Sequence, residues 1–395
     1  MLRQILALAF IFVCTTIAWV ILGTTINSRT YDSNQQLQGR VGSTWGTSQQ
    51  QSPPTAAYFL DDVESSTTVE NGKVVVHSHT IHHQNFLPME ASQIHVNFRL
   101  NPRQKGLLWY STYAVDFDGD FIFRNDTAET RRVDFRLKFP AQKAIYDGLQ
   151  MKVNGQSLAL SNDDQGTAAQ ATIGPGQTAA LHVAYRSQGL DCWRYQLGNG
   201  VAQARDFMLT MQTNFRDIDF ADDTLSPTSK QPIPGGWQLT WQYANLISGF
   251  QIGMTMPAKP QPGPLAGEIS YAAPVSLFFF FFLMFIITTL RKIDLHPMNY
   301  FFLATAFFAF HLLLAYLVDH ISIHAAMAVA SVVSVTLVVS YLRGGGLALR
   351  RAGGGHGAID LSCVVLLRVL LEGIHGPGNY YYRHHHAVCG DADDW

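Results

Sequence analysis

The segment most suited to chemistry is a histidine-rich run whose residues 77–83 read HSHTIHH. In an extended strand, His77, His79 and His83 point to the same side, because side chains alternate between the two faces. Neutral imidazoles grouped in this way can bind Zn²⁺, Cu²⁺ or Ni²⁺. We therefore take these three residues as candidate metal ligands. A solvated, polar strand edge is the alternative interpretation.

A second polar run resembles part of a calcium-binding loop, since residues 116–120 read DFDGD. An EF-hand loop needs glycine at its sixth position and glutamate at its twelfth. Counted from Asp116, the glycine is the fourth residue and the twelfth is Thr127. The sequence therefore favours a β-hairpin turn at Asp118-Gly119 over a calcium site.

His311 is an ionisable residue in the middle of an apolar segment. Such a residue inside a membrane is a functional candidate by default. With Asp319, His320 and His324 beyond the end of the same segment, a proton-linked role is one interpretation. The other is a neutral histidine that forms a hydrogen bond to a neighbouring helix.

Motifs of the common enzyme classes are missing from the sequence. It contains no G-x-S-x-G elbow, no H-E-x-x-H pair and no P-loop, so we expect neither catalysis nor a bound cofactor. The net charge is −2, which gives no attraction to nucleic acid. Only 14% of the residues are charged, against about 25% in ordinary soluble domains, which indicates a membrane protein.

Four apolar segments are long enough to cross a hydrocarbon core of about 30 Å as helices. They are residues 2–22, 269–290, 298–318 and 325–342. The first ends without an Ala-x-Ala site, so we expect an uncleaved anchor over residues 1–23 rather than a signal peptide. The other three predict a helix bundle over residues 269–343.

The cationic residues indicate how these segments are oriented. If the four segments alternate in direction, Arg3, Arg291, Lys292 and Arg343 all fall on one side, while residues 319–324 contain no Lys or Arg. Cytoplasmic loops are enriched in Lys and Arg. The sequence therefore predicts a multi-pass protein with a cytoplasmic N-terminus and with residues 24–268 outside the cytoplasm.

Residues 24–268 are predicted to form an all-β, antiparallel domain. Residues 24–56 are polar and are expected to be a tether and loop. Strict alternation of apolar and polar residues then predicts strands, as in residues 94–100, 133–139, 180–185 and 238–243. Turn signals separate the strands at Asn154-Gly155, 174–176 and Gly235-Gly236. We expect a sandwich from Phe121 onward.

Residues 290–300, which read LRKIDLHPMNY, resemble the CreD family of bacterial inner-membrane proteins. Residues 301–342 also resemble the apolar helices of that family, and residues 42–54 and 86–119 resemble it more loosely. The resemblance implies a Gram-negative inner membrane, a periplasmic domain and a role in envelope integrity under a two-component regulator. It supplies no catalytic residue, and it implies more membrane helices than the four counted above.

The tail, residues 344–395, departs abruptly from an apolar bundle. It contains two glycine triplets, and its end reads NYYYRHHHAVCGDADDW. Reading the codons one base later turns Tyr, His, Asn and Asp into Ile, Met or Thr, which restores apolar runs. We therefore expect a frame-shifted remnant of further transmembrane helices. A histidine-rich, metal-binding cytoplasmic tail and an expression tag are the alternatives.

The leading hypothesis is a non-enzymatic inner-membrane protein that contributes to envelope integrity or to the envelope stress response. Its expected partners are the lipid bilayer and other envelope proteins, and not nucleic acid. One alternative is a transporter or channel component that uses His311 and the histidines on the outer face. Another is a periplasmic metal sensor built on His77, His79 and His83.

Overall fold

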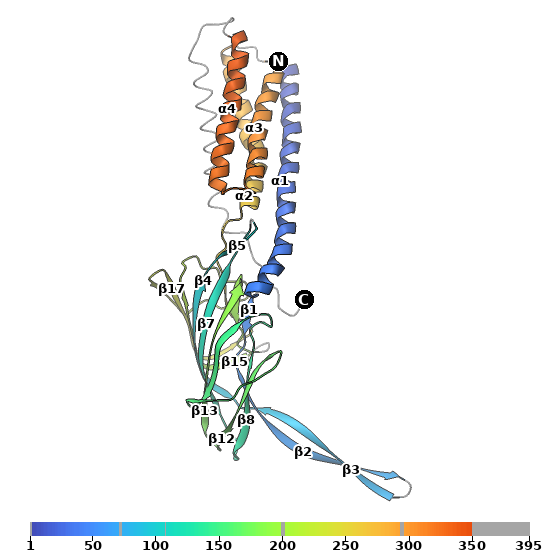
Figure 1. Cartoon of the computed structure of the whole chain (residues 1–395), viewed down its shortest axis with the longest axis vertical. Coiled ribbons are helices and arrows are strands. Elements are labelled where there is room, and N and C mark those ends of the chain that lie inside the picture. Colours follow the sequence, from blue (N-terminus) through green and yellow to red (C-terminus); the bar gives the residue numbers. More distant parts are fainter. Residues whose placement is uncertain (1, 71–72, 107, 199–201, 293–295, 350–395) are drawn as a thin grey trace. The chain divides into compact units, whose positions relative to one another are not determined.

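The computed structural model describes residues 2–349 except 71–72, 107, 199–201 and 293–295 (Figure 1). Its helices are α1 (Leu2–Trp45), α2 (Pro262–Leu290), α3 (Pro297–Leu317) and α4 (Ile323–Leu349). The described residues divide into a helical unit, made of those up to Gln38, Gln104–Trp109 and those from Pro260 to Leu349, and a β unit, made of those in Gly39–Arg103 and Tyr110–Lys259.

All four helices of the described chain are long and apolar enough to cross a membrane. Neighbouring helices run antiparallel. Phe12 of α1 lies beside Phe278 of α2, with ring centroids 6.0 Å apart, and Thr24 lies 3.0 Å from the hydroxyl of Tyr271. The Tyr341 hydroxyl of α4 donates to Asn299 near the start of α3, at 2.7 Å. The membrane anchor and the C-terminal bundle therefore form one packed group of helices.

The prediction of a tether over residues 24–56 is wrong for its first two thirds, because α1 continues to Trp45. The polar part of this segment has no proline, and its Gln and Arg residues favour helix almost as well as apolar residues do. The helix stops at Trp45, directly before Gly46, whose φ of 121° few other residues adopt. The first strand follows at Gln49.

The described strands form two large sheets and two small ones. The eight-stranded sheet has the order β10-β9-β13-β7-β4-β15-β17-β16, and the five-stranded sheet has the order β11-β12-β8-β2-β3. The small sheets are β1-β14-β18 and β5-β6. The strand bounds are β1 (Gln49–Gln51), β2 (Thr55–Glu70), β3 (Lys73–Phe86), β4 (Met89–Leu100), β5 (Arg103–Lys105), β6 (Leu108–Tyr110), β7 (Thr112–Arg124), β8 (Arg131–Lys138), β9 (Tyr146–Val153), β10 (Gln156–Ser157), β11 (Ser161–Asn162), β12 (Gly166–Ile173), β13 (Thr178–Leu190), β14 (Cys192–Tyr195), β15 (Ala202–Thr213), β16 (Ser229–Ile233), β17 (Gly236–Ser248) and β18 (Ile252–Thr255).

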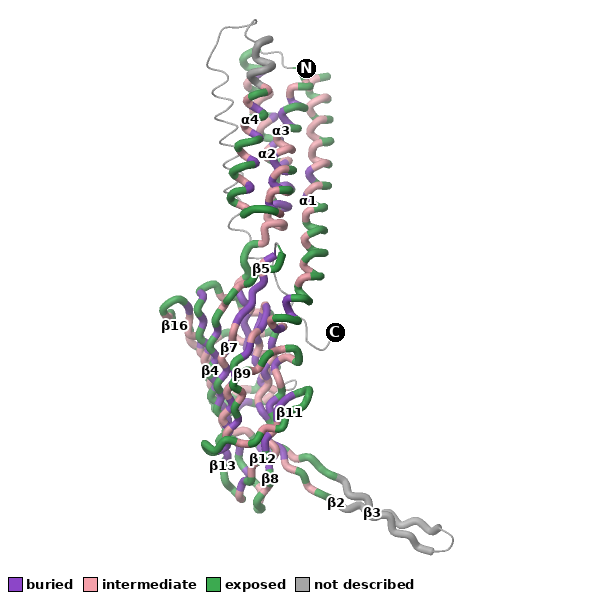
Figure 2. The backbone as a smooth tube through the Cα atoms, in the orientation of Figure 1, coloured by how far each residue is buried: buried purple, intermediate pink, exposed green. Residues whose placement is uncertain are grey.

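A single hydrophobic core joins the two large sheets. Buried and exposed residues alternate along β4, β7, β8 and β13, so each sheet turns one face inward (Figure 2). Phe123 of β7 packs edge-on against Phe135 of β8, with ring centroids 5.8 Å apart. The predicted β-rich sandwich is confirmed, although it already begins with β2 and β4. Most pairs are antiparallel, but β15 pairs with β4 in parallel.

Three predicted turns are confirmed. Asn154 and Gly155 have φ angles of 51° and 80°, as a type I′ hairpin requires, and connect β9 to β10. Gly176 lies between β12 and β13 with φ 69°. Gly235 lies in the hairpin between β16 and β17 with φ 86°.

The hairpin turn predicted at Asp118-Gly119 is wrong, because β7 runs straight through it. Asp118 pairs with His95 of β4, and Gly119 pairs with Val183 of β13. Gly119 lies on the inner face, where an added Cβ would stand 2.8 Å from the ring of Phe121. The glycine therefore makes room for an aromatic core and does not reverse the chain.

Candidate functional site

The predicted histidine ligands lie on β3, in a long hairpin with β2. His77 pairs with Ser66, His79 with Glu64 and His83 with Leu60. His83 is exposed, whereas the side chains of His77 and His79 lie outside the described residues. Their convergence on a metal ion therefore stays a prediction.

His311 is buried within the helical unit, with 3% of its surface exposed. Its Nδ1 lies 3.0 Å from the carbonyl of Phe307, one turn earlier in α3. The ring packs edge-on against Trp19 of α1, with ring centroids 5.5 Å apart. Asp319 pairs instead with Arg29, at 3.1 Å. The structure thus packs His311 among aromatic rings and does not bring it to Asp319.

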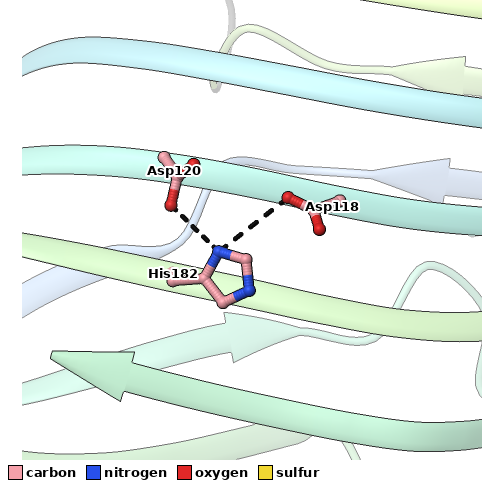
Figure 3. Close-up of side chains that lie close together, drawn as sticks. All are labelled: Asp118, Asp120 and His182. Atoms are coloured by element: carbon pink, nitrogen blue, oxygen red, sulfur yellow. Dashed lines mark hydrogen bonds and ion pairs between the residues drawn. The ribbon is translucent and has the colours of Figure 1, made fainter. Parts of the chain in front are cut away.

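The densest group of potential ligands in the described chain lies on the outer face of the eight-stranded sheet. Asp118 and Asp120 share one face of β7 because they are two residues apart, and His182 of β13 pairs directly with Asp120. Figure 3 shows both carboxylates directed at one ring nitrogen of His182. His182 Nδ1 lies 2.9 Å from Asp120 Oδ1 and 3.8 Å from Asp118 Oδ1.

Neighbouring strands extend this outer-face cluster of Asp118, Asp120 and His182. His95 of β4 is exposed and lies opposite Asp118, so it faces the same side of the sheet. Asp116, the next outward residue of β7, is engaged by two arginines, Arg99 at 3.0 Å and Arg186 at 3.6 Å. The arginines therefore neutralise Asp116, while His182 is the group directed at the other two aspartates.

A hollow of about 330 Å³ lies beside the cluster on the same face. Asp120 of β7 and Asp206 of β15 both line it, as do Gln93 and Gln242. Asp206 adopts φ 39°, an uncommon value for a residue other than glycine. The hollow leaves room for solvent or a small polar ligand next to Asp120.

The sequence contains a signal for this cluster that a turn interpretation conceals. Asp116, Asp118 and Asp120 alternate with apolar residues of β7, and His182 occupies an outward position in the alternating segment 180–185. The two-residue spacing of the aspartates alone predicts that they lie on one face of a strand. The register between β7 and β13, which brings His182 to them, is visible only in the fold.

The inner face contains tyrosines that serve structure rather than chemistry. Burial raises the pKa of Tyr113 and Tyr185 well above the usual value. The Tyr113 hydroxyl donates to the carbonyl of Cys192 at 2.7 Å, and that of Tyr185 donates to Gln51 at 2.6 Å. Both remain neutral donors that fix neighbouring strands.

Two solved structures are similar to parts of this chain. One is a protein of Legionella pneumophila described as a nutrient binding protein, with 14% identity and a TM-score of 0.36, over 49% of this chain and 71% of that one. The other is an M1 zinc metallopeptidase of Deinococcus radiodurans, with 14% identity and a TM-score of 0.29, over 43% of this chain and 42% of that one. At these values neither structure lends its activity to this protein. No curated protein matches the chain.

The family model described as "Inner membrane protein CreD" matches residues 268–372. The match begins within α2 and covers α3 and α4. It extends into the tail, which from residue 350 lies outside the described residues, so the change of reading frame expected there stays a prediction. The helices, their order around a β domain and this match together confirm the resemblance to the CreD family of inner membrane proteins over residues 268–372.

Proposed function

We propose that this protein supports the integrity of the cell envelope from the inner membrane, with its β domain on the periplasmic side. The observation that carries the proposal is the family match over residues 268–372, because it coincides with the packed membrane helices. The β domain then has the bilayer and other envelope components as its accessible partners.

The ends of the helices support the orientation. Since α1 and α2 are antiparallel, Arg3 at the start of α1 lies at the same end of the bundle as Arg291 and Lys292, which follow α2. The opposite end carries Arg29, which is paired with Asp319. This charge distribution is the one expected when the first end is cytoplasmic.

The ionisable groups of the β domain support binding rather than catalysis. The side chains of Asp118 and Asp120 are 53% and 60% exposed. Enzymes gain most from charged groups held in sites from which water is excluded. An open face of this kind suits the reversible binding of an ion or a partner. The aromatic packing around His311 likewise gives no support to a transport pathway.

The experiment is to delete the gene and to measure envelope permeability to a large antibiotic and survival in detergent. We expect the deletion to increase permeability to the antibiotic and to reduce survival in detergent. The full-length wild-type gene should restore both properties. Unchanged sensitivity of the deletion strain under both stresses would contradict the proposal. The same assay is repeated with Asp120→Asn and His182→Ala to test whether the cluster on the outer face of the sheet takes part. Wild-type resistance of both variants at normal abundance would exclude the cluster from this function.

A further inference from the structure

We propose that Asp118, Asp120 and His182 form a binding site for a first-row divalent metal ion, of which Zn²⁺ is the best fit, with His95 as a fourth ligand. The site lies in the β domain, on the outer face of its eight-stranded sheet. It is distinct from the histidine-rich segment of β3.

The first argument is the convergence of donor atoms. One atom from each of Asp118, Asp120 and His182 lies within 4.8 Å of the others. Ligands held about 2.1 Å from one ion stand about 3.0–3.4 Å apart in octahedral or tetrahedral geometry. In the structure, His182 Nδ1 lies 2.9 Å from Asp120 Oδ1 and 3.8 Å from Asp118 Oδ1, on either side of that range. A small side-chain rotation of Asp118 would complete the arrangement without moving the backbone.

The second argument is charge. His182 Nδ1 carries at most one proton, so it can satisfy Asp120 at 2.9 Å but not Asp118 at 3.8 Å as well. Lys152 of β9 lies opposite His182, but in the described part of the chain no ion pair joins Lys152 to either aspartate. Two neighbouring carboxylates therefore share one imidazole, and a divalent cation would neutralise both.

The third argument is the identity of the donors. Ca²⁺ and Mg²⁺ prefer oxygen ligands alone, whereas an imidazole nitrogen favours Zn²⁺ and its first-row neighbours. His95 lies on the other side of β7 from His182 and faces the same way as Asp118. His95 Nε2 lies 3.4 Å from Gln93 Nε2, which is a long hydrogen bond, so the ring can turn toward the ion. The resulting set is two imidazoles and two carboxylates, and the adjacent hollow leaves room for water.

The test measures Zn²⁺ binding to the full chain in detergent, by calorimetry against ZnCl₂. We expect one equivalent for the wild type, and a loss of affinity of about tenfold or more for Asp120→Asn and for His182→Ala, because each removes a ligand. His95→Ala should lose less, about two- to tenfold, since a water molecule can take its place. Each variant must keep the unfolding temperature that the wild type has without Zn²⁺.

Two control variants separate this site from its rivals. Asp116→Asn removes the same charge from the same face of β7, and we expect it to bind Zn²⁺ within about threefold of the wild type if ligation rather than charge matters. The triple variant His77→Ala, His79→Ala, His83→Ala should also retain binding. The proposal fails if the wild type binds no Zn²⁺, if His182→Ala binds like the wild type, or if the triple variant alone abolishes binding. X-ray absorption at the zinc edge must detect imidazole nitrogen, and a spectrum with oxygen ligands only would likewise overturn the site.

Discussion

The partly buried side chain of Tyr146 contributes to the stability of the β domain. Its hydroxyl donates to the carbonyl of Ala141 and accepts from the amide of the same residue, at 2.7 Å and 2.9 Å. Burial raises the pKa of Tyr146 to about 12. The neutral form is therefore favoured in the folded state. Its contribution to stability is complete below pH ~10, where tyrosine in the unfolded chain is still protonated, and is lost as the pH rises toward 12.

We therefore predict that Tyr146→Phe makes unfolding less dependent on pH above 10. The part of the alkaline loss due to Tyr146 is about 2–3 kcal/mol, from its pKa shift. Urea unfolding of both proteins between pH 7 and pH 11.5 measures the difference. Identical slopes in the alkaline range would show that this hydroxyl does not contribute.

For His311, we predict a structural role. Its ring packs between α3, to which it belongs, and Trp19 of α1. His311→Leu should therefore leave the protein inserted in the membrane and lower the free energy of unfolding by about 1–2 kcal/mol or less. Cells carrying this variant should tolerate envelope stress as the wild type does. A variant that is inserted at normal abundance yet loses this tolerance would restore the proton-linked hypothesis.

Single residues also mark where prediction from the sequence fails. Asp118-Gly119 has the composition of a turn, but the alternation of buried residues in β7 continues through it. Local turn preference gave way to packing, because Gly119 lies beneath the ring of Phe121. Because a turn at Asp118-Gly119 would interrupt the strand, that prediction also fails to place Asp118 and Asp120 on one face of β7.

At the level of elements, α1 and α2 approach each other where a glycine of one helix faces a larger side chain of the other. Gly263, Gly267 and Tyr271 recur every four residues along α2 and lie against Thr30, Asn27 and Gly23 of α1. A Cβ at Gly267 would stand 2.6 Å from Asn27 Oδ1. Small residues at such spacing allow membrane helices to approach closely.

We predict that Gly267→Leu separates these helices and lowers the stability of the bundle by about 1–3 kcal/mol through overpacking. The matched control is Gly39→Leu in the facing helix α1, where an added Cβ meets nothing within 4 Å. That change should instead stabilise by up to ~1 kcal/mol through helix propensity. Thermal unfolding in detergent compares the two. Equal effects of both substitutions would exclude a packing role for Gly267.

The elements divide into those that local pattern predicts and those that it does not. The alternating segments 94–100, 133–139, 180–185 and 238–243 fall in β4, β8, β13 and β17. The polar half of α1 is not predictable from composition, because its Ser, Thr, Gln and Gly residues are as typical of a tether as of a helix. The parallel pairing of β4 with β15 brings together residues far apart in the chain, which no local signal encodes.

For the whole molecule, the proposed orientation predicts the outcome of reporter fusions. Alkaline phosphatase, which is active only outside the cytoplasm, should be active when fused after Lys259 and inactive when fused after Lys292. The reason is the cationic end shared by α1 and α2. The reverse pattern of activity would overturn the orientation. Sequencing the gene would separately test the expected change of reading frame in the tail.

The small sheet β1-β14-β18 can form only after its last strand has been synthesised, because its strands come from the start, the middle and the end of the β domain. Its first strand, at Gln49–Gln51, is among the earliest parts of the β domain to be synthesised, and its last, at Ile252–Thr255, immediately precedes α2. Pairings between such distant segments form slowly, and the waiting strands expose edges that can aggregate. The domain can close only after nearly all of it has been delivered. We therefore expect its maturation to depend on factors that shield unfinished chains, and a ribosome stalled before residue 252 should leave the domain sensitive to protease.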